Sequence, residues 1–227
     1  MQIETTLQPP AAPNFDAAPH IVVHFPLQGR RLPADHGYAL HAAITRHLPA
    51  LHQADWLGVE LISGVPWQAG LIVLPTRGAH LRLRLPATHF AQVLPLAGQR
   101  LDIDGHQLRL GIPTARPLMP APSLYARVVT IKHHTDAEPF LAAARLKLAA
   151  LNITADLELP LDEQGRVRRR VITIKGQHIV GFSLAAHNLS DDDSLRLQTH
   201  GLGGRRAMGG GIFNPIASAH RAGERSA

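Results

Sequence analysis

The apolar pattern of this chain predicts the same order of secondary-structure elements in its two halves. In the first half, a strand-like run at residues 21–25 precedes a helix whose apolar residues recur at helical spacing from Leu40 to Leu48. Asp35 is placed to cap this helix, and Pro49 is placed to end it. The elements that follow are short apolar runs at 59–62 and 71–74, the strictly alternating half-buried strand 80–85, a short helix at 88–94 and a hairpin at 100–110.

A proline-rich segment separates the two halves. Residues 112–123 contain four prolines and break every regular pattern, so we expect them to be a linker. The order then repeats, with strands expected at 124–132, 156–159, 167–175, 178–184 and 212–216 and with helices expected at 137–151, after Asp136, and from Ser190 to Gly201. Two successive β-α-β-β-α-β units predict an α+β fold of two tandem ferredoxin-like (RRM-like) domains with antiparallel sheets. The domains would span 20–111 and 124–216, the second with a Gly-rich loop, after a disordered leader at 1–19 and before a tail at 217–227.

The charge balance indicates the class of partner. The 227 residues include 23 Lys and Arg against 17 Asp and Glu, and the sequence pI of about 10.7 favours a polyanion. No apolar run approaches the roughly 20 residues of a membrane-spanning helix, so we expect nucleic acid rather than a membrane. The absence of cysteine excludes disulfides and thiolate metal sites and favours a cytoplasmic protein.

The stretch 201–212 combines six glycines with the pair Arg205 and Arg206. Such a loop can bring backbone N–H groups and two guanidinium groups close to phosphates, although a plain flexible turn is the alternative. A Rossmann fingerprint would need a third glycine where Arg206 stands, and a P-loop would need Lys and Ser or Thr after Gly209. Mononucleotide binding is therefore disfavoured.

The spacing of these glycines resembles a known family. Gly201-Leu202-Gly203, five residues and Gly209-Gly210-Gly211 are similar to the C-terminal hallmark of the CRISPR RNA-maturation endoribonucleases of the RAMP superfamily, including the myxobacterial-type variant. Gly210 stands where that hallmark has an apolar residue. The resemblance extends to 32–40, to Leu51-His52 and to 124–132.

The resemblance implies a metal-independent endoribonuclease that binds CRISPR repeat RNA and cleaves precursor transcripts to mature crRNAs. It implies no cofactor, and it implies a repeat hairpin or crRNA 3′ end as partner together with other CRISPR effector subunits. Two alternatives stay open. One is a non-catalytic subunit that holds a CRISPR RNA end in an effector complex, and the other is a general RNA-binding protein outside CRISPR immunity.

Metal-free RNA cleavage sets the residue types to look for. Attack of a ribose 2′-OH on the adjacent phosphorus needs a base, an acid and cations, and histidine suits the proton transfers at neutral pH. Candidates around the first helix are His36, Tyr38, His41, His47 and His52. The resemblance favours a histidine in or just after this helix, so His52 is the first catalytic candidate and Tyr38, His41 and His47 are the others. Each histidine alone could instead be a solvated surface residue, and no HExxH or similar cluster predicts a metal site.

Basic residues elsewhere are candidates for holding RNA. Residues 166–178 contain no acid, and alternation places Arg166, Arg168 and Arg170 on one strand face, a stripe suited to phosphates or, alternatively, a charged hairpin edge. The full set of candidate RNA-binding residues is Arg166, Arg168, Arg170, Lys132, Lys175, Gly201, Gly203, Gly204, Arg205, Arg206, Gly209 and Gly211. Because aromatic residues make up only 4% of the chain, we expect contacts to the backbone and shape of folded RNA rather than base stacking.

Overall fold

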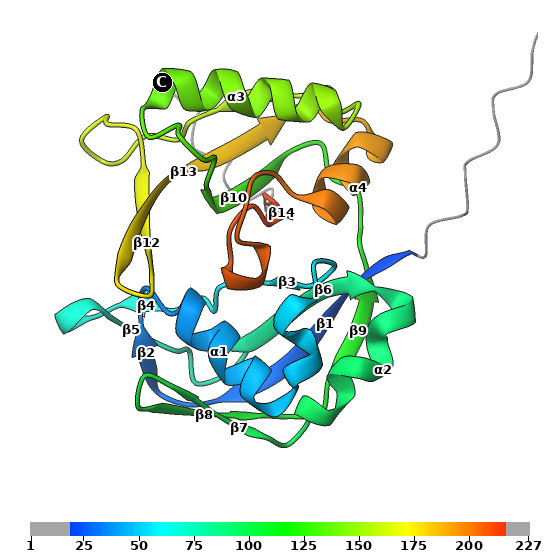
Figure 1. Cartoon of the computed structure of the whole chain (residues 1–227), viewed down its shortest axis with the longest axis vertical. Helices are drawn as coiled ribbons and strands as arrows, with labels where there is room; N and C mark the ends of the chain where they lie inside the picture. The colour runs from blue at the N-terminus through cyan, green and yellow to red at the C-terminus, as the bar shows by residue number, and fades with distance from the viewer. Residues whose placement is uncertain (1–18, 217–227) are drawn as a thin grey trace, which may run out of the picture.

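The computed structural model describes residues 19–216, which form two halves stacked one above the other (Figure 1). The lower half comprises β1 (His20–Gln28), β2 (Arg31–Pro33), α1 (Gly37–His47), β3 (Gly58–Val59), β4 (Val65–Pro66), β5 (Leu71–Val73), β6 (His80–Pro86), α2 (Phe90–Val93), β7 (Arg100–Ile103), β8 (His106–Leu110) and β9 (Thr114–Pro117). The upper half comprises β10 (Leu124–Val129), α3 (Ala137–Ala150), β11 (Asp156–Glu158), β12 (Arg169–Ile174), β13 (Gln177–His187), α4 (Asp191–His200) and β14 (Phe213–Pro215).

The two halves share one sheet topology. The lower sheet contains the order β3-β6-β1-β8 and the upper sheet the order β11-β13-β10-β14, so each follows second, third, first and fourth strand. All pairings are antiparallel, which confirms the prediction of two ferredoxin-like units. The additional strands extend this plan: β7 pairs with β8, β9 with β1 and β12 with β13, while β2, β5 and β4 form a small sheet.

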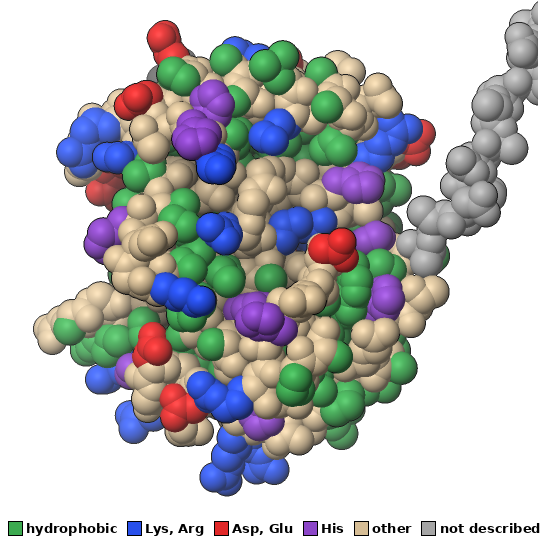
Figure 2. Space-filling model, viewed as in Figure 1, with side chains coloured by type: hydrophobic (Ala, Val, Ile, Leu, Met, Phe, Trp, Pro, Cys, Tyr) green, Lys and Arg blue, Asp and Glu red, His purple; other side chains and the backbone are tan. Residues whose placement is uncertain are grey.

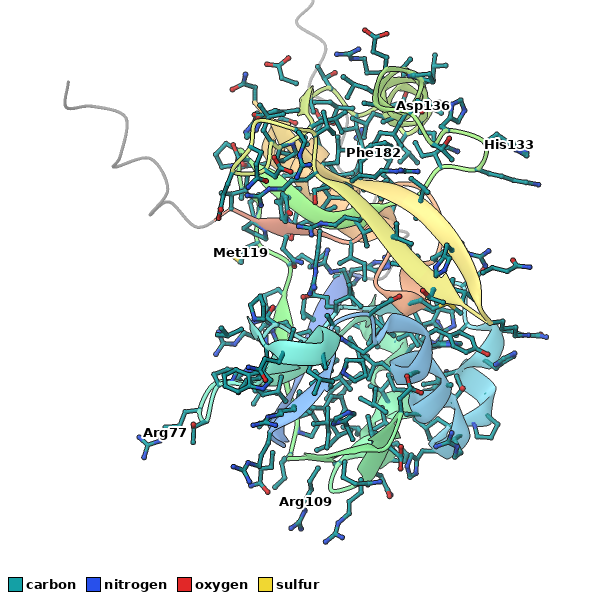
Figure 3. All side chains as sticks on the ribbon, turned by 90° about the vertical axis from the view of Figure 1, so that its left-hand side faces the viewer. Arg77, Arg109, Met119, His133, Asp136 and Phe182 are labelled. Atoms are coloured by element: carbon teal, nitrogen blue, oxygen red, sulfur yellow. The ribbon has the colours of Figure 1, made fainter. Side chains whose placement is uncertain are left out.

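Each half buries one face of its sheet under helices. In the lower half, alternate residues of β1 and β6, among them Phe25 and Leu83, are fully buried with Leu40 and Ile44 of α1. In the upper half, Phe182 of β13, labelled in Figure 3, packs against Phe140 of α3 with ring centroids 4.8 Å apart. On the opposite face of the lower sheet, Arg84 contacts the upper half.

Two helix starts show how well capping could be read. The helix α4 begins at Ser190 as predicted, and Ser190 caps it, because its Oγ accepts a hydrogen bond of 3.1 Å from the backbone N–H of Asp193. The prediction that Asp35 caps α1 is wrong, since α1 begins at Gly37 and its N-cap residue His36 makes no side-chain cap bond. The Asp35 carboxylate instead accepts a hydrogen bond of 2.7 Å from the N–H of Thr173 in β12. A contact between the halves has replaced a local one.

The proline-rich segment is only partly irregular. The expectation that 112–123 breaks every regular pattern is wrong for Thr114–Pro117, which form β9 and pair with residues 21–24 of β1. Pro117 is tolerated because β9 is an edge strand, where one side needs no N–H donor. The leader expected at 1–19, apart from Pro19, and the tail expected at 217–227 lie outside the described residues.

Candidate functional site

The Gly-rich loop of the upper half descends from α4 onto α1 and β3 of the lower half (Figure 1). The contact leaves no room for side chains. A Cβ at Gly37, the first residue of α1, would overlap the carbonyl oxygen of Met208, and a Cβ at Gly209 would overlap the side chain of Leu61. The φ of Gly209 is +87°, which also favours glycine. The loop therefore contacts the N-terminal end of α1 directly.

The glycines also close the loop on itself. The N–H of Leu202 donates to the Gly211 carbonyl at 3.1 Å, and the N–H of Gly211 donates to the Val128 carbonyl at 2.8 Å. A Cβ at Gly210 would overlap the Gly204 carbonyl oxygen, which explains why no apolar side chain stands there. The N–H groups of Gly204, Gly209, Gly210 and Gly211 all donate within the protein. The glycines thus serve close packing within the protein, and anion binding by the loop stays a prediction.

The two loop arginines have different surroundings. Arg205 adopts a left-handed φ of 68° and its side chain is exposed. Arg206 turns inward, where its Nη1 donates to the His200 carbonyl at 2.8 Å and its guanidinium lies near Gly58. Burial, and then the charge of Arg84, lower the pKa of Arg206 to about 10. Only Arg205 of this pair is freely available to an RNA phosphate.

His41 and His52 form a pair beside the loop. His41 lies one helical turn beyond Gly37, on the same face of α1, and its ring centroid is 5.9 Å from that of His52 in the 3₁₀-helix Pro49–Gln53. His41 is only 5% exposed, and its Nε2 is buried without a hydrogen-bond partner. Burial, with a smaller effect of His52, lowers the pKa of His41. His52 is exposed, so the pair joins a buried neutral imidazole to an accessible one.

The other histidine and tyrosine candidates lie in different places. Tyr38 is half-buried next to Gly37, at the same end of α1 as the loop. His47 ends α1, where its Nε2 is 3.0 Å from the Arg100 carbonyl oxygen of β7. His47 is six residues beyond His41, a rise of about 9 Å along the helix. The structure therefore brings Tyr38 and His41 to the loop but leaves His47 apart.

Both ring nitrogens of His36 are hydrogen-bonded to the protein backbone. Its Nδ1 lies 2.7 Å from the Pro33 carbonyl oxygen, and its Nε2 accepts a hydrogen bond of 2.9 Å from the N–H of Ile62. Burial is the main cause that lowers the pKa of His36, to about 4. The ring is therefore neutral at pH 7 with both nitrogens engaged, which leaves none for proton transfer.

The prediction that Arg166, Arg168 and Arg170 share one face of a strand is wrong. β12 begins only at Arg169, and Arg166 lies in a turn where its guanidinium pairs with Asp162 at 3.0 Å. The Asp162 carboxylate also accepts the N–H of Arg166, so a local ion pair shapes this turn. Arg168 precedes the strand and donates from Nε to the Leu161 carbonyl at 2.8 Å. Arg170 alone of the predicted stripe lies within β12.

Lys132 and Lys175 are exposed, as a role in binding RNA requires. Lys175 and Gly176 form the two-residue turn of the β12–β13 hairpin, both with positive φ. Figure 3 shows this hairpin reaching from the upper half to the lower one, where Thr173 contacts Asp35. Figure 2 shows Lys, Arg and His side chains across the middle of the face that carries the Gly-rich loop and α1.

Sequence reasoning missed two arginines that the structure makes prominent. Arg127 of β10 lies beside Arg170, and desolvation followed by the charge of Arg170 lowers the pKa of Arg127, although its side chain keeps an exposed part. Alternation along β10 could have found it, because Tyr125 and Arg127 share the face opposite Leu124 and Ala126. Arg84 is 1% exposed between the halves, and no single-sequence signal marks it.

Residues 19–216 contain neither a candidate metal site nor a membrane-spanning helix. In this range no group of three or more His, Asp or Glu side chains could hold a metal ion. No helix of the same range is long and apolar enough to cross a membrane.

Comparison with known proteins places this architecture. The family described as Cas6 Crispr matches residues 21–218. The CRISPR-associated endonuclease Cas6 of Myxococcus xanthus (strain DK1622) is 45% identical over 197 residues, which cover 87% of this chain and 82% of that protein. Among solved structures, a CRISPR-associated protein Cas6 matches with a TM-score of 0.62 at 12% identity, covering 87% of this chain and all of that one. A Cas6-related protein from Pyrococcus furiosus matches with a TM-score of 0.60 at 14% identity, covering 88% of this chain and 99% of that one. The chain therefore belongs to the Cas6 family of CRISPR proteins.

Proposed function

We propose that this protein is an endoribonuclease that binds CRISPR repeat RNA and cleaves precursor transcripts to mature crRNAs, by 2′-OH attack and without a metal. One observation carries the proposal. The Gly-rich loop of the upper half contacts Gly37 at the start of α1, one helical turn before His41, and His41 lies beside His52. The Myxococcus xanthus protein that is 45% identical to this chain is a CRISPR-associated endonuclease, which supports an endonuclease reaction here. Assembly with other CRISPR effector subunits stays a prediction from the resemblance.

The histidine pair supplies groups suited to this reaction. His52 is exposed and can reach a ribose or a leaving oxygen, so we assign it the proton transfer. His41 lies against it with a pKa lowered by burial, so at neutral pH it presents an uncharged ring to His52. We assign Tyr38, near the start of the same helix, to holding the 2′-OH. The exposed Arg205 can offset the charge that develops on the phosphorane.

The basic side chains between the halves offer a path for the RNA backbone. Arg127 and Arg170 lie side by side on β10 and β12, where their mutual repulsion favours an anion. Arg168, Lys132 and Lys175 add exposed or solvent-facing cations around this region. Since a polyanion releases counterions when it meets such a surface, we expect binding that weakens steeply with salt.

Incubation with the repeat RNA encoded beside the gene, in the presence of EDTA, tests this proposal. Wild-type protein should cut the RNA at one position and leave a 2′,3′-cyclic phosphate or its hydrolysed form, because the ribose supplies the nucleophile. A 2′-deoxy substitution at the nucleotide before the cut should abolish cleavage while leaving binding intact. Loss of cleavage in EDTA would overturn the mechanism. Binding without cleavage under any condition would favour the non-catalytic subunit instead.

A further inference from the structure

Arg84 is the largest fully buried side chain of the described residues, and it lies where the two halves meet. The alternation of β6 predicts an outward-facing side chain at this position, opposite Leu83 and Leu85. The upper half covers this face of the lower sheet, so the side chain is only 1% exposed. A buried guanidinium is retained only where acceptors satisfy it.

Four acceptors meet the Arg84 guanidinium. Its Nη1 donates to the backbone carbonyls of Gln198 at 3.0 Å and Phe213 at 2.7 Å. Its Nη2 donates to the carboxylate of Glu60 at 2.9 Å and to the side-chain oxygen of Asn214 at 2.8 Å. Three of these acceptors belong to the upper half, and Glu60 supplies the neutralising charge from the lower half.

Two of these acceptors lie at the two ends of the Gly-rich loop. Gln198 lies in the last turn of α4, three residues before the Gly-rich loop begins, and Phe213 directly follows residue 212, where the loop ends. One guanidinium of the lower sheet therefore holds both ends of the loop. The same sheet region touches the loop interior, because a Cβ at Gly58, opposite Arg84 on β3, would meet Arg84 at 3.3 Å and Arg206 at 3.5 Å.

We propose that Arg84 is a positioning residue, which fixes both ends of the Gly-rich loop to the lower sheet and so sets the loop relative to the His41–His52 pair. The histidines belong to the lower half and the loop to the upper half, so a rigid joint between them is needed to keep the site assembled. The catalytic consequence rests on the proposed function, whereas the structural consequence does not. Misplacement of catalytic groups by about 1 Å can cost on the order of 10²-fold in rate.

Arginine suits this position in a way that lysine does not. Its planar fork offers N–H donors in fixed directions, and the four on Nη1 and Nη2 here meet two carbonyls, one amide oxygen and one carboxylate. Lysine would keep the charge and the pairing with Glu60 but could not reach all four acceptors. Arg84→Lys is therefore the informative substitution. Arg82→Lys is its control, because Arg82 lies on the same strand and contacts Glu60 at 3.6 Å with a side chain that is 44% exposed.

A distance measurement tests the structural part. The chain has no cysteine, so spin labels can be placed at Gln53→Cys, next to His52, and at Arg205→Cys in the loop, both at exposed positions. We expect one narrow distance distribution in the otherwise wild-type protein and after Arg82→Lys, and a broadened or shifted distribution after Arg84→Lys. Should Arg84→Lys fail to fold, Asn214→Ala removes one acceptor only and should move the distribution in the same direction by less.

A kinetic measurement tests the catalytic part. In unlabelled protein, Arg84→Lys should slow single-turnover cleavage by saturating protein roughly 10- to 100-fold, with affinity for uncleavable 2′-deoxy RNA changed far less. A narrow, unshifted distribution together with a normal rate in folded Arg84→Lys would overturn the proposal, as would equal effects of Arg82→Lys. If wild-type protein does not cleave the RNA, the proposed function fails, and the distance measurement still decides the role of Arg84.

Discussion

His41 and His52 are neighbours with opposite exposure, and this difference decides which of them can meet a substrate. His52 lies on a short 3₁₀-helix with its side chain in solvent, whereas His41 is 5% exposed with Nε2 facing no partner. A buried neutral ring next to an accessible one can orient it without competing for the same proton. The family resemblance ranked His52 first among the candidates, but the sequence could not predict that His41 is buried and His52 exposed, because their burial depends on how residues 49–53 fold back over α1.

At the residue scale, His52→Ala should slow cleavage by about 10² to 10⁴ because one proton-transfer group is lost. RNA affinity should stay nearly unchanged, since a single imidazole contributes little to phosphate binding beside the arginines and lysines. Single-turnover rates and binding to 2′-deoxy RNA measure the two effects separately. His47→Ala is the matched control, because His47 ends the neighbouring helix and contacts the Arg100 carbonyl away from the loop. A normal rate for His52→Ala would move the assignment to His41 or Tyr38.

The Gly-rich loop is the element that the sequence identified most clearly, although its packing could not be predicted. Its glycine spacing predicted the family, but the glycines turn out to close the loop and dock it on α1 and Leu61. Spacing alone cannot show which N–H groups are already used within the fold. The same limit applies to the arginine stripe, where the Asp162–Arg166 ion pair forms a turn that alternation cannot foresee.

The two loop arginines should therefore behave differently when replaced one at a time. Arg205→Ala should weaken RNA binding and reduce the slope of log affinity against log salt by up to about one, because an exposed phosphate contact is lost. Arg206→Ala should leave that slope nearly unchanged, since its guanidinium donates to the His200 carbonyl inside the protein. Fluorescence anisotropy with uncleavable RNA over a salt series measures both. Equal changes in slope would show that Arg206 turns outward when RNA binds.

For the whole molecule, the sequence predicted each half and almost nothing of how they meet. Element order, the start of α4 at Ser190 and the hairpin at 100–110 follow from local rules, and the structure confirms them. The contacts across the junction do not follow from local rules. They join Asp35 to Thr173, Arg84 to Asn214 and Gly37 to Met208. Their partners are more than a hundred residues away, so no local pattern could assign them. These contacts make the junction a part of the fold whose stability can be probed as a unit.

The pH dependence of unfolding tests the junction through His36. The His36 ring is buried between Pro33 and Ile62 and lies within the field of Arg127 from the other half, so the folded state keeps it neutral with a pKa of about 4. The unfolded chain protonates it near pH 6.5, and the folded protein therefore loses stability as pH falls from about 6.5 towards 4. From these values, His36 alone should lower the free energy of unfolding by about 2 kcal/mol between pH 7 and pH 5.

Urea unfolding at pH 7 and pH 5 measures this loss of stability. The variant His36→Gln cannot titrate at this position, so its free energy of unfolding should fall correspondingly less between the two pH values, whatever its stability at pH 7. The imidazole NMR signals of wild-type His36 should stay those of the neutral ring down to about pH 4. Equal losses in both proteins, or protonation near pH 6.5, would show that the junction admits charge and water at this position.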